Sequence, residues 1–519
     1  MYPTIDQLAA DLAAGSTTSL QLTEAALARA QDPAGEGARV FTLIDAARAR
    51  AAAQASDLLR AAGMVRSPLE GLPVSVKDLF DVAGQVTTAG SVVLKDAPPA
   101  ARNAPVIDRL IAAGAVIVGR TNMTEFAFSG LGLNPHYGTP KNPWDRAGGG
   151  RIPGGSSSGA AVSVTDGMAV VAIGSDTGGS VRIPSALCGL TGFKPTQRRV
   201  PIDGTVPLST SLDSIGPLAA SVRCCAIVDA VLAGEPPVVP AARDVRDARL
   251  AVPETLVLDG MDSAVAAAFE RACARLQAAG ARLSRIAVPA FAELGRLHAR
   301  GTLAGAEAWA WHRTLLTTRG DEYDPRVGLR MRGGEAMGAA DYIDLLAARR
   351  RWIAQVAARI AGFDALLMPT VPVVAPRIDA LTNSDEAYFA ANGLMLRNPT
   401  LINFLDGCAL SLPCHAEGEP PVGLTLAGAG GRAADMLALG LAVDFEWMNR
   451  QMFYGAYQRV NGLFGNTACE TRGLPSPEEL ALMAPWRKDL PAAAFGAMAA
   501  PPSTDPPSSL RANLRRAQQ

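Results

Sequence analysis

Two glycine- and serine-rich turns, each next to an apolar run, constrain the fold of this chain more than any other feature. The first is GGSSSG at 154–159, and the second is DTGGS at 176–180, directly after the apolar run 169–173. Successive glycines let backbone N–H groups converge on one point, which is how a developing negative charge is stabilised. The second turn therefore indicates a catalytic or anion-binding loop. The simpler interpretation is a tight strand-to-helix turn capped by Ser180. A phosphate-binding loop is a weaker interpretation of this turn, because no Gly-Lys-Ser/Thr follows it.

The periodicity of apolar residues predicts strands that alternate with helices. Strands are expected at 72–77, 115–119, 169–173 and 363–369, and helices at 4–14, 17–31, 46–62, 104–113, 263–280 and 335–361. This alternation predicts an α/β fold whose sheet is covered by helices on both faces.

The composition limits the kinds of binding partner and the cellular compartment that we expect for this protein. The formal net charge is −1 over 519 residues, which provides no electrostatic footprint for nucleic acid or an anionic membrane. The seven cysteines are odd in number and show no CxxC pair or metal-ligand spacing, so we expect reduced thiols and no metal site. The N-terminus lacks the regions of a secretory signal, and no apolar run reaches about 18 residues. We therefore expect a cytoplasmic protein.

One large domain is expected over 1–485, with a catalytic core at about 70–220. From 486 to 519 the chain becomes rich in proline and serine and poor in apolar residues. This composition predicts a disordered C-terminal tail.

Lys77 stands among apolar neighbours and is the third chemical feature. Burial disfavours the charged form of a lysine, lowers its pKa and can turn it into a base. None of the four histidines lies within 140–196. A relay of two serines and a lysine can activate a hydroxyl group without a histidine. Taken alone, Lys77 is better interpreted as a surface lysine beside Asp78.

Together these segments closely resemble the amidase signature family. The resemblance rests on PGGSSSGAAVSV from Pro153, on IGSDTGGSVRIPSALCGLTGFKPT ending at Thr196, and on shorter matches at 73–78, 119–126, 210–217 and 421–424. It covers about 4–445. It implies a single large α/β/α sandwich with a mixed central sheet.

The resemblance also implies a role for each matching residue. Ser180 would be the nucleophile that forms the acyl-enzyme, and Lys77 would be the base. Ser156, which would follow a cis peptide bond, would be the serine that bridges them. The oxyanion hole would be formed by the backbone N–H groups of Thr177, Gly178, Gly179 and Ser180. The loop would be braced by the side chains of Ser157, Asp176 and Arg182.

The substrate pocket is expected along 123–129 and before the apolar run at 410–413. Phe126, Phe128, Ser129 and Asn403 are the candidates, and an apolar lining suggests an aryl or alkyl acyl group held without a charged clamp. The alternative is that both phenylalanines pack in the core.

The function implied is hydrolysis of a small-molecule amide with no cofactor and no metal. Esters or carbamates can be cleaved by the same acyl chemistry. A glutaminase subunit of a tRNA-dependent amidotransferase is the main alternative, and it would need partner chains. An inactive binding protein is disfavoured by the intact Lys77, Ser156 and Ser180. A homodimer is compatible with this fold class, although no sequence feature specifies one.

Overall fold

The computed structural model describes the backbone of residues 2–455 and the side chains of residues 2–444. Contacts between residues divide the chain into two units, Met1–Leu441 and Ala442–Gln519. All predicted site residues belong to the first unit. The predicted domain end at 485 and the predicted tail at 486–519 lie outside the described residues.

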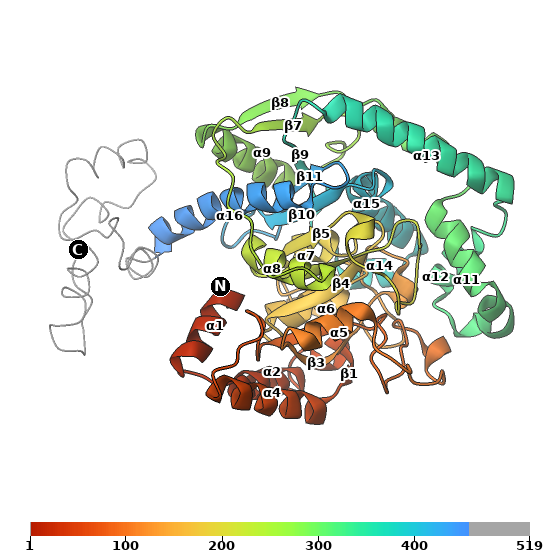
Figure 1. Cartoon of the computed structure of the whole chain (residues 1–519). Coiled ribbons are helices and arrows are strands. Elements are labelled where there is room, and N and C mark those ends of the chain that lie inside the picture. Colours follow the sequence, from red (N-terminus) through yellow and green to blue (C-terminus); the bar gives the residue numbers. More distant parts are fainter. Residues whose placement is uncertain (1, 456–519) are drawn as a thin grey trace, which may run out of the picture. The chain divides into compact units, whose positions relative to one another are not determined.

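A mixed sheet of 11 strands forms the centre of the first unit (Figure 1). Its order is β1-β3-β2-β4-β6-β5-β10-β11-β9-β7-β8. The pairs β2–β3, β2–β4, β7–β8 and β7–β9 are parallel and the other pairs are antiparallel. The strands are β1 (Phe41–Ile44), β2 (Pro73–Lys77), β3 (Val116–Thr121), β4 (Val171–Asp176), β5 (Thr191–Lys194), β6 (Ser214–Ala219), β7 (Arg249–Pro253), β8 (Arg282–Ile286), β9 (Ala365–Pro369), β10 (Cys408–Pro413) and β11 (Gly423–Gly428).

Helices flank this sheet. Helices α6 and α7 contact its central strands, α8 contacts β5 and β6, and α9 contacts β8 and β9. The α-helices are α1 (Ile5–Ala14), α2 (Ser19–Ala30), α3 (Gly37–Val40), α4 (Ala46–Ala61), α5 (Pro105–Ala112), α6 (Ser158–Thr165), α7 (Arg182–Cys188), α8 (Val222–Ala233), α9 (Ser263–Ala278), α10 (Ala290–Leu297), α11 (Leu303–Arg319), α12 (Pro325–Arg332), α13 (Ala339–Ile360), α14 (Ile378–Thr382), α15 (Asp385–Phe404) and α16 (Ala433–Gly455). Five 3₁₀ turns complete the described part: η1 (Val92–Leu94), η2 (Glu125–Ala127), η3 (Ala147–Gly149), η4 (Gln197–Arg199) and η5 (Gly320–Glu322). None of the described helices is both long and apolar enough to cross a membrane.

The predicted α/β class and mixed sheet are confirmed, and each predicted strand and helix overlaps an observed element. Sequence periodicity did not identify the other seven strands, among them β5, β6, β10 and β11, which complete the middle of the sheet. β5 has four residues, and glycine interrupts the apolar pattern of β5, β6 and β11. Short apolar runs of this kind carry little periodic signal.

The parallel pairing of β2 with β4 places the two candidate turns near Lys77. Val74 pairs with Val171 and Val76 with Ile173, so both strands end at the same edge of the sheet. Open α/β sheets bind ligands beyond the carboxyl ends of their strands. Lys77 is the last residue of β2, and the DTGGS turn begins at the end of β4.

Asp78 is held by a buried arginine and not by its neighbour Lys77. Arg120 on β3 donates from Nε to Asp78 Oδ1 at 2.6 Å and from a terminal nitrogen to the Phe80 carbonyl at 2.7 Å. Both partners of the ion pair are nearly inaccessible to solvent. The interpretation of Lys77 as a surface lysine beside its aspartate is therefore wrong.

Replacing Arg120 by glutamine is expected to destabilise the fold by about 3–5 kcal/mol, because the Asp78 carboxylate would stay buried without its cation. Urea unfolding measures this change. Arg50→Gln is the matched control, because its pair with Glu24 is exposed and we expect a far smaller effect. Equal losses of stability in both variants would contradict the assignment.

Candidate active site

Lys77 lies fully buried at the end of β2, and its amine is bound by two hydroxyl groups. Nζ donates to Ser156 Oγ at 2.7 Å and to Ser175 Oγ at 2.8 Å. Burial lowers the pKa of the Lys77 amine to about 7, against the raising effect of the Asp213 and Asp176 carboxylates. A large fraction of this amine is therefore neutral near pH 7 and able to accept a proton.

The first glycine-serine turn places Ser156 against this amine. The peptide bond between Gly155 and Ser156 is cis, and the side chain of Ser156 is buried. Ser157 precedes helix α6, and its hydroxyl points at the Ser175 carbonyl. A Cβ on Gly174 would lie 2.7 Å from Ser157 Oγ, so glycine is needed there for the turn to approach β4.

The second turn carries Ser180 just before helix α7. Its carbonyl accepts the Ser157 N–H at 3.3 Å, so the two turns touch. Among the described residues, the hydroxyls of Ser156 and Ser180 are not hydrogen-bonded to each other. Catalytic hydrogen bonds are often long before substrate binds, so this geometry does not disqualify the pair.

The N–H groups of the second turn are not all available to a ligand. Gly179 N–H donates to Asp176 Oδ1 at 2.8 Å, which removes it from the expected oxyanion hole. Within the described part of the chain, the N–H groups of Thr177, Gly178 and Ser180 have no protein acceptor. Gly179 has a φ of 126°, and a Cβ there would lie 2.6 Å from Pro399, so the turn requires glycine.

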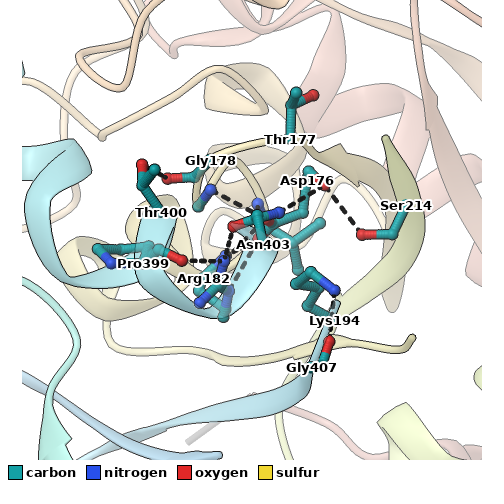
Figure 2. Close-up of polar contacts among 12 residues, drawn as sticks. Asp176, Thr177, Gly178, Arg182, Lys194, Ser214, Pro399, Thr400, Asn403 and Gly407 are labelled. Atoms are coloured by element: carbon teal, nitrogen blue, oxygen red, sulfur yellow. Dashed lines mark hydrogen bonds and ion pairs between the residues drawn. The ribbon is translucent and has the colours of Figure 1, made fainter. Parts of the chain in front are cut away.

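Asp176 organises this turn from inside the protein (Figure 2). Arg182 binds both carboxylate oxygens, at 2.9 and 3.0 Å, and Asn403 Nδ2 donates to Oδ1 at 2.9 Å. Ser214 Oγ donates to the Asp176 carbonyl at 2.9 Å. Burial acts to raise the pKa of Asp176, but Arg182 together with Lys194 and Asn403 holds it well below the usual range. The carboxylate therefore stays ionised.

Two further buried ionisable groups lie beside the turn. Asp213 accepts a 2.5 Å hydrogen bond from Thr177 Oγ1, and burial raises its pKa to about 6. Lys194 donates to the carbonyls of Pro195 and Gly407 at 2.6 and 2.7 Å, and burial lowers its pKa to about 8.

The Asn403 side chain contacts the carboxylate that holds the second turn. It is 2% exposed, its amide nitrogen donates to Asp176, and its Oδ1 accepts a 2.6 Å bond from Arg182. Its carboxamide is used entirely in bracing the turn, and its place in the substrate pocket stays a prediction.

The other three expected pocket residues are all buried. Phe126 packs in an aromatic cluster with His312 and Tyr323, at centroid distances of 4.3 and 5.3 Å, which favours the alternative of a core residue. Ser129 Oγ donates to Asn392 Oδ1 at 3.0 Å. Phe128 lies beneath the guanidinium of Arg330.

Sequence reasoning missed Ser175 as a partner of Lys77, and it quoted Asp213 only as part of a motif. Both were detectable in principle, because each is a polar residue at the edge of a buried strand. Buried polar groups are normally hydrogen-bonded, so such residues require a partner. Their partners, however, come from other strands and turns.

Comparison with known proteins identifies the family of this chain. The family model described as Amidase matches residues 21–437. The chain is 40% identical over 405 residues to 2-amino-5-chloromuconic acid deaminase of Comamonas testosteroni, covering 77% of this chain and 87% of that protein. It is 34% identical over 488 residues to a Glutamyl-tRNA(Gln) amidotransferase subunit of Chloroflexus aggregans, covering 87% and 98%.

A solved structure described as an amidase has the same fold. The TM-score is 0.76 at 33% sequence identity, and the match covers 85% of this chain and 99% of that one. The chain therefore belongs to the amidase family of hydrolases.

Proposed function

We propose that this amidase cleaves the C–N bond of a carboxylic acid amide through an acyl-enzyme formed on Ser180. The observation that carries the proposal is the 2.7 Å hydrogen bond from the buried Lys77 amine to Ser156, next to the turn that bears Ser180. A lysine whose pKa is about 7 can act as a base near neutral pH.

In the proposed mechanism, neutral Lys77 accepts the proton of Ser156, and Ser156 accepts that of Ser180. Ser180 Oγ then forms a bond to the substrate carbonyl carbon. The N–H groups of Thr177, Gly178 and Ser180 stabilise the resulting oxyanion. The proton returns through Ser156 to the leaving nitrogen as the C–N bond breaks, and water cleaves the acyl-enzyme by the same relay.

The acyl group is proposed to be an alkyl or aryl chain. Leu396 would lie 3.5 Å from a Cβ on Gly178 and 3.2 Å from one on Gly130, so an apolar side chain spans the space between these two glycines. Phe128 continues the apolar surface beyond Gly130. Ester or carbamate substrates fit the same chemistry, because only the leaving group differs.

A glutaminase subunit of a tRNA-dependent amidotransferase is the second candidate. It is favoured by the relative from Chloroflexus aggregans, which is matched over nearly its whole length. A free-standing enzyme is preferred because the deaminase relative is the more similar of the two. That relative acts on a carboxylic acid of low molecular weight, according to its name.

Ser180→Ala is expected to abolish turnover of a panel of aliphatic amides, aryl amides, anilides, esters, carbamates and free glutamine, read by mass spectrometry. Ser284→Ala, on the exposed face of β8, is the matched control and should retain full activity. Turnover that survives in Ser180→Ala would refute the nucleophile. Turnover of glutamine alone would favour the amidotransferase role.

The acid limb of the pH–rate profile tests Lys77. Only the neutral amine accepts a proton, so kcat/KM should fall below an apparent pKa of about 7 and level off above it. The Asp213 carboxylate raises the pKa of Lys77, so Asp213→Asn should move the limb to lower pH. A profile that is flat through this range would contradict Lys77 as the base.

Asn403→Leu is expected to lower kcat by about 10²-fold with a small change in KM, because the turn that holds the oxyanion donors loses its brace to Asp176. Steady-state kinetics on an amide substrate measures this. Asn383→Leu, at the end of the short helix α14, is the matched control. A rise in KM with kcat unchanged would instead indicate a substrate contact.

A further inference from the structure

Helix α11 binds the loop that precedes β6 through the carboxylate of Glu307. Its Oε2 atom accepts the Ser209 hydroxyl at 2.7 Å and the Ser211 N–H at 3.0 Å. The other oxygen, Oε1, accepts the Tyr342 hydroxyl at 2.7 Å. Tyr342 lies on α13, so this one side chain joins two outer helices to a loop of the central sheet.

The loop ends at Asp213, which holds the side chain of Thr177 in the second glycine-serine turn. Asp213 Oδ1 accepts the Thr177 hydroxyl at 2.5 Å. Its Oδ2 accepts the N–H groups of Leu208 and Ser209, each at 3.0 Å. Ser209 therefore binds two carboxylates, Asp213 through its N–H and Glu307 through its hydroxyl. This serine couples helix α11 to the turn that carries the proposed nucleophile.

A second contact fixes the same loop from another side. Arg349 on α13 donates to the Ser211 carbonyl at 3.3 Å and to the carbonyls of Asn403 and Phe404 at 3.1 and 2.9 Å. The peptide groups on both sides of Ser211 are thus held, one by Arg349 and one by Glu307. Loss of the Glu307 carboxylate would leave the loop attached through Arg349, so we expect a shift of the loop and not an unfolded chain.

The position of Asp213 affects two parts of the proposed reaction centre. The Thr177 N–H is one of the donors proposed to stabilise the oxyanion, and the Thr177 side chain is bound by Asp213. Both residues line a small cavity together with Ser175, which binds the Lys77 amine. Burial lowers the pKa of Lys77, and the Asp213 carboxylate opposes this effect. A displaced Asp213 would therefore disturb the oxyanion donor and the base together.

We propose that Glu307 is a positioning residue for amide cleavage, which acts through Ser209 and Asp213 to fix the Thr177 N–H where the oxyanion develops. The inference rests on the proposed function and adds a residue from an outer helix to it. Oxyanion donors act because they are preorganised, and their bonds strengthen only as charge develops on the substrate oxygen. A small displacement of the turn should therefore lower kcat without weakening the binding of the substrate.

Glu307→Leu is expected to lower kcat on an amide substrate by about 10-fold with KM nearly unchanged, because the loop loses the carboxylate that positions it. Glu307→Gln keeps an oxygen that can accept the Ser209 hydroxyl, so it should retain most of kcat. Glu270→Leu is the matched control, because it removes a carboxylate from an exposed ion pair on α9 and should change neither constant. An unchanged kcat in Glu307→Leu, or an effect confined to KM, would overturn the role.

A double-mutant cycle with Thr177→Val tests the connection itself. Valine removes the hydroxyl that binds Asp213 and keeps the backbone N–H of residue 177. If Glu307 acts through Asp213, the chain with both Thr177→Val and Glu307→Leu should have a kcat close to that of the slower single variant. Losses that multiply would show that the two side chains act independently, and they would refute the connection.

Hydrogen exchange of the turn decides the inference without relying on turnover. In the full chain, the amides of a peptic fragment that contains 176–180 should exchange several-fold faster in Glu307→Leu and at an unchanged rate in Glu270→Leu. Equal exchange in Glu307→Leu and the unmodified chain would refute the positioning role. If no amide is cleaved, or Ser180→Ala retains turnover, the proposed function fails, and the exchange rates still decide whether Glu307 positions the turn.

Discussion

The candidate site depends on the polar contacts of one ionised carboxylate, that of Asp176. It is buried, and it accepts hydrogen bonds from the N–H groups of Gly179, Val181 and Arg182 as well as from the Arg182 and Asn403 side chains. Charge-assisted bonds of this number offset the loss of water around the carboxylate. The N–H groups of Thr177, Gly178 and Ser180, in contrast, have no protein acceptor in the described part of the chain.

Two buried lysines lie near this carboxylate, and their partners distinguish them. Lys77 is bound by hydroxyl groups, which can donate as well as accept a hydrogen bond. Lys194 is bound by backbone carbonyls, which only accept, so its partners favour the protonated amine. Burial lowers the pKa of both, yet only Lys77 has a neighbour from which it can take a proton.

Helix α15 contacts both the turn that carries Ser180 and the segment 129–130. Near its C-terminus, Asn403 and the Pro399 carbonyl bind Arg182 behind the Ser180 turn. Nearer its N-terminus, Tyr388 and Asn392 lie beside Ser129. A single helix therefore sets the distance between the segment around Ser129 and the turn that carries Ser180, which is how a fold preorganises a site.

The sequence alone determined the α/β class, the strand that ends at Lys77, a strand before the DTGGS turn, and the two turns that carry Ser156 and Ser180. These features are local, since glycine and serine spacing and apolar periodicity report the conformation of neighbouring residues. Only the tertiary structure decided that Asn403 faces Asp176, that Asp78 pairs with Arg120, and that Glu307 binds the loop before Asp213. Each depends on residues far apart in sequence, and periodicity reports whether a residue is buried but not which group it meets.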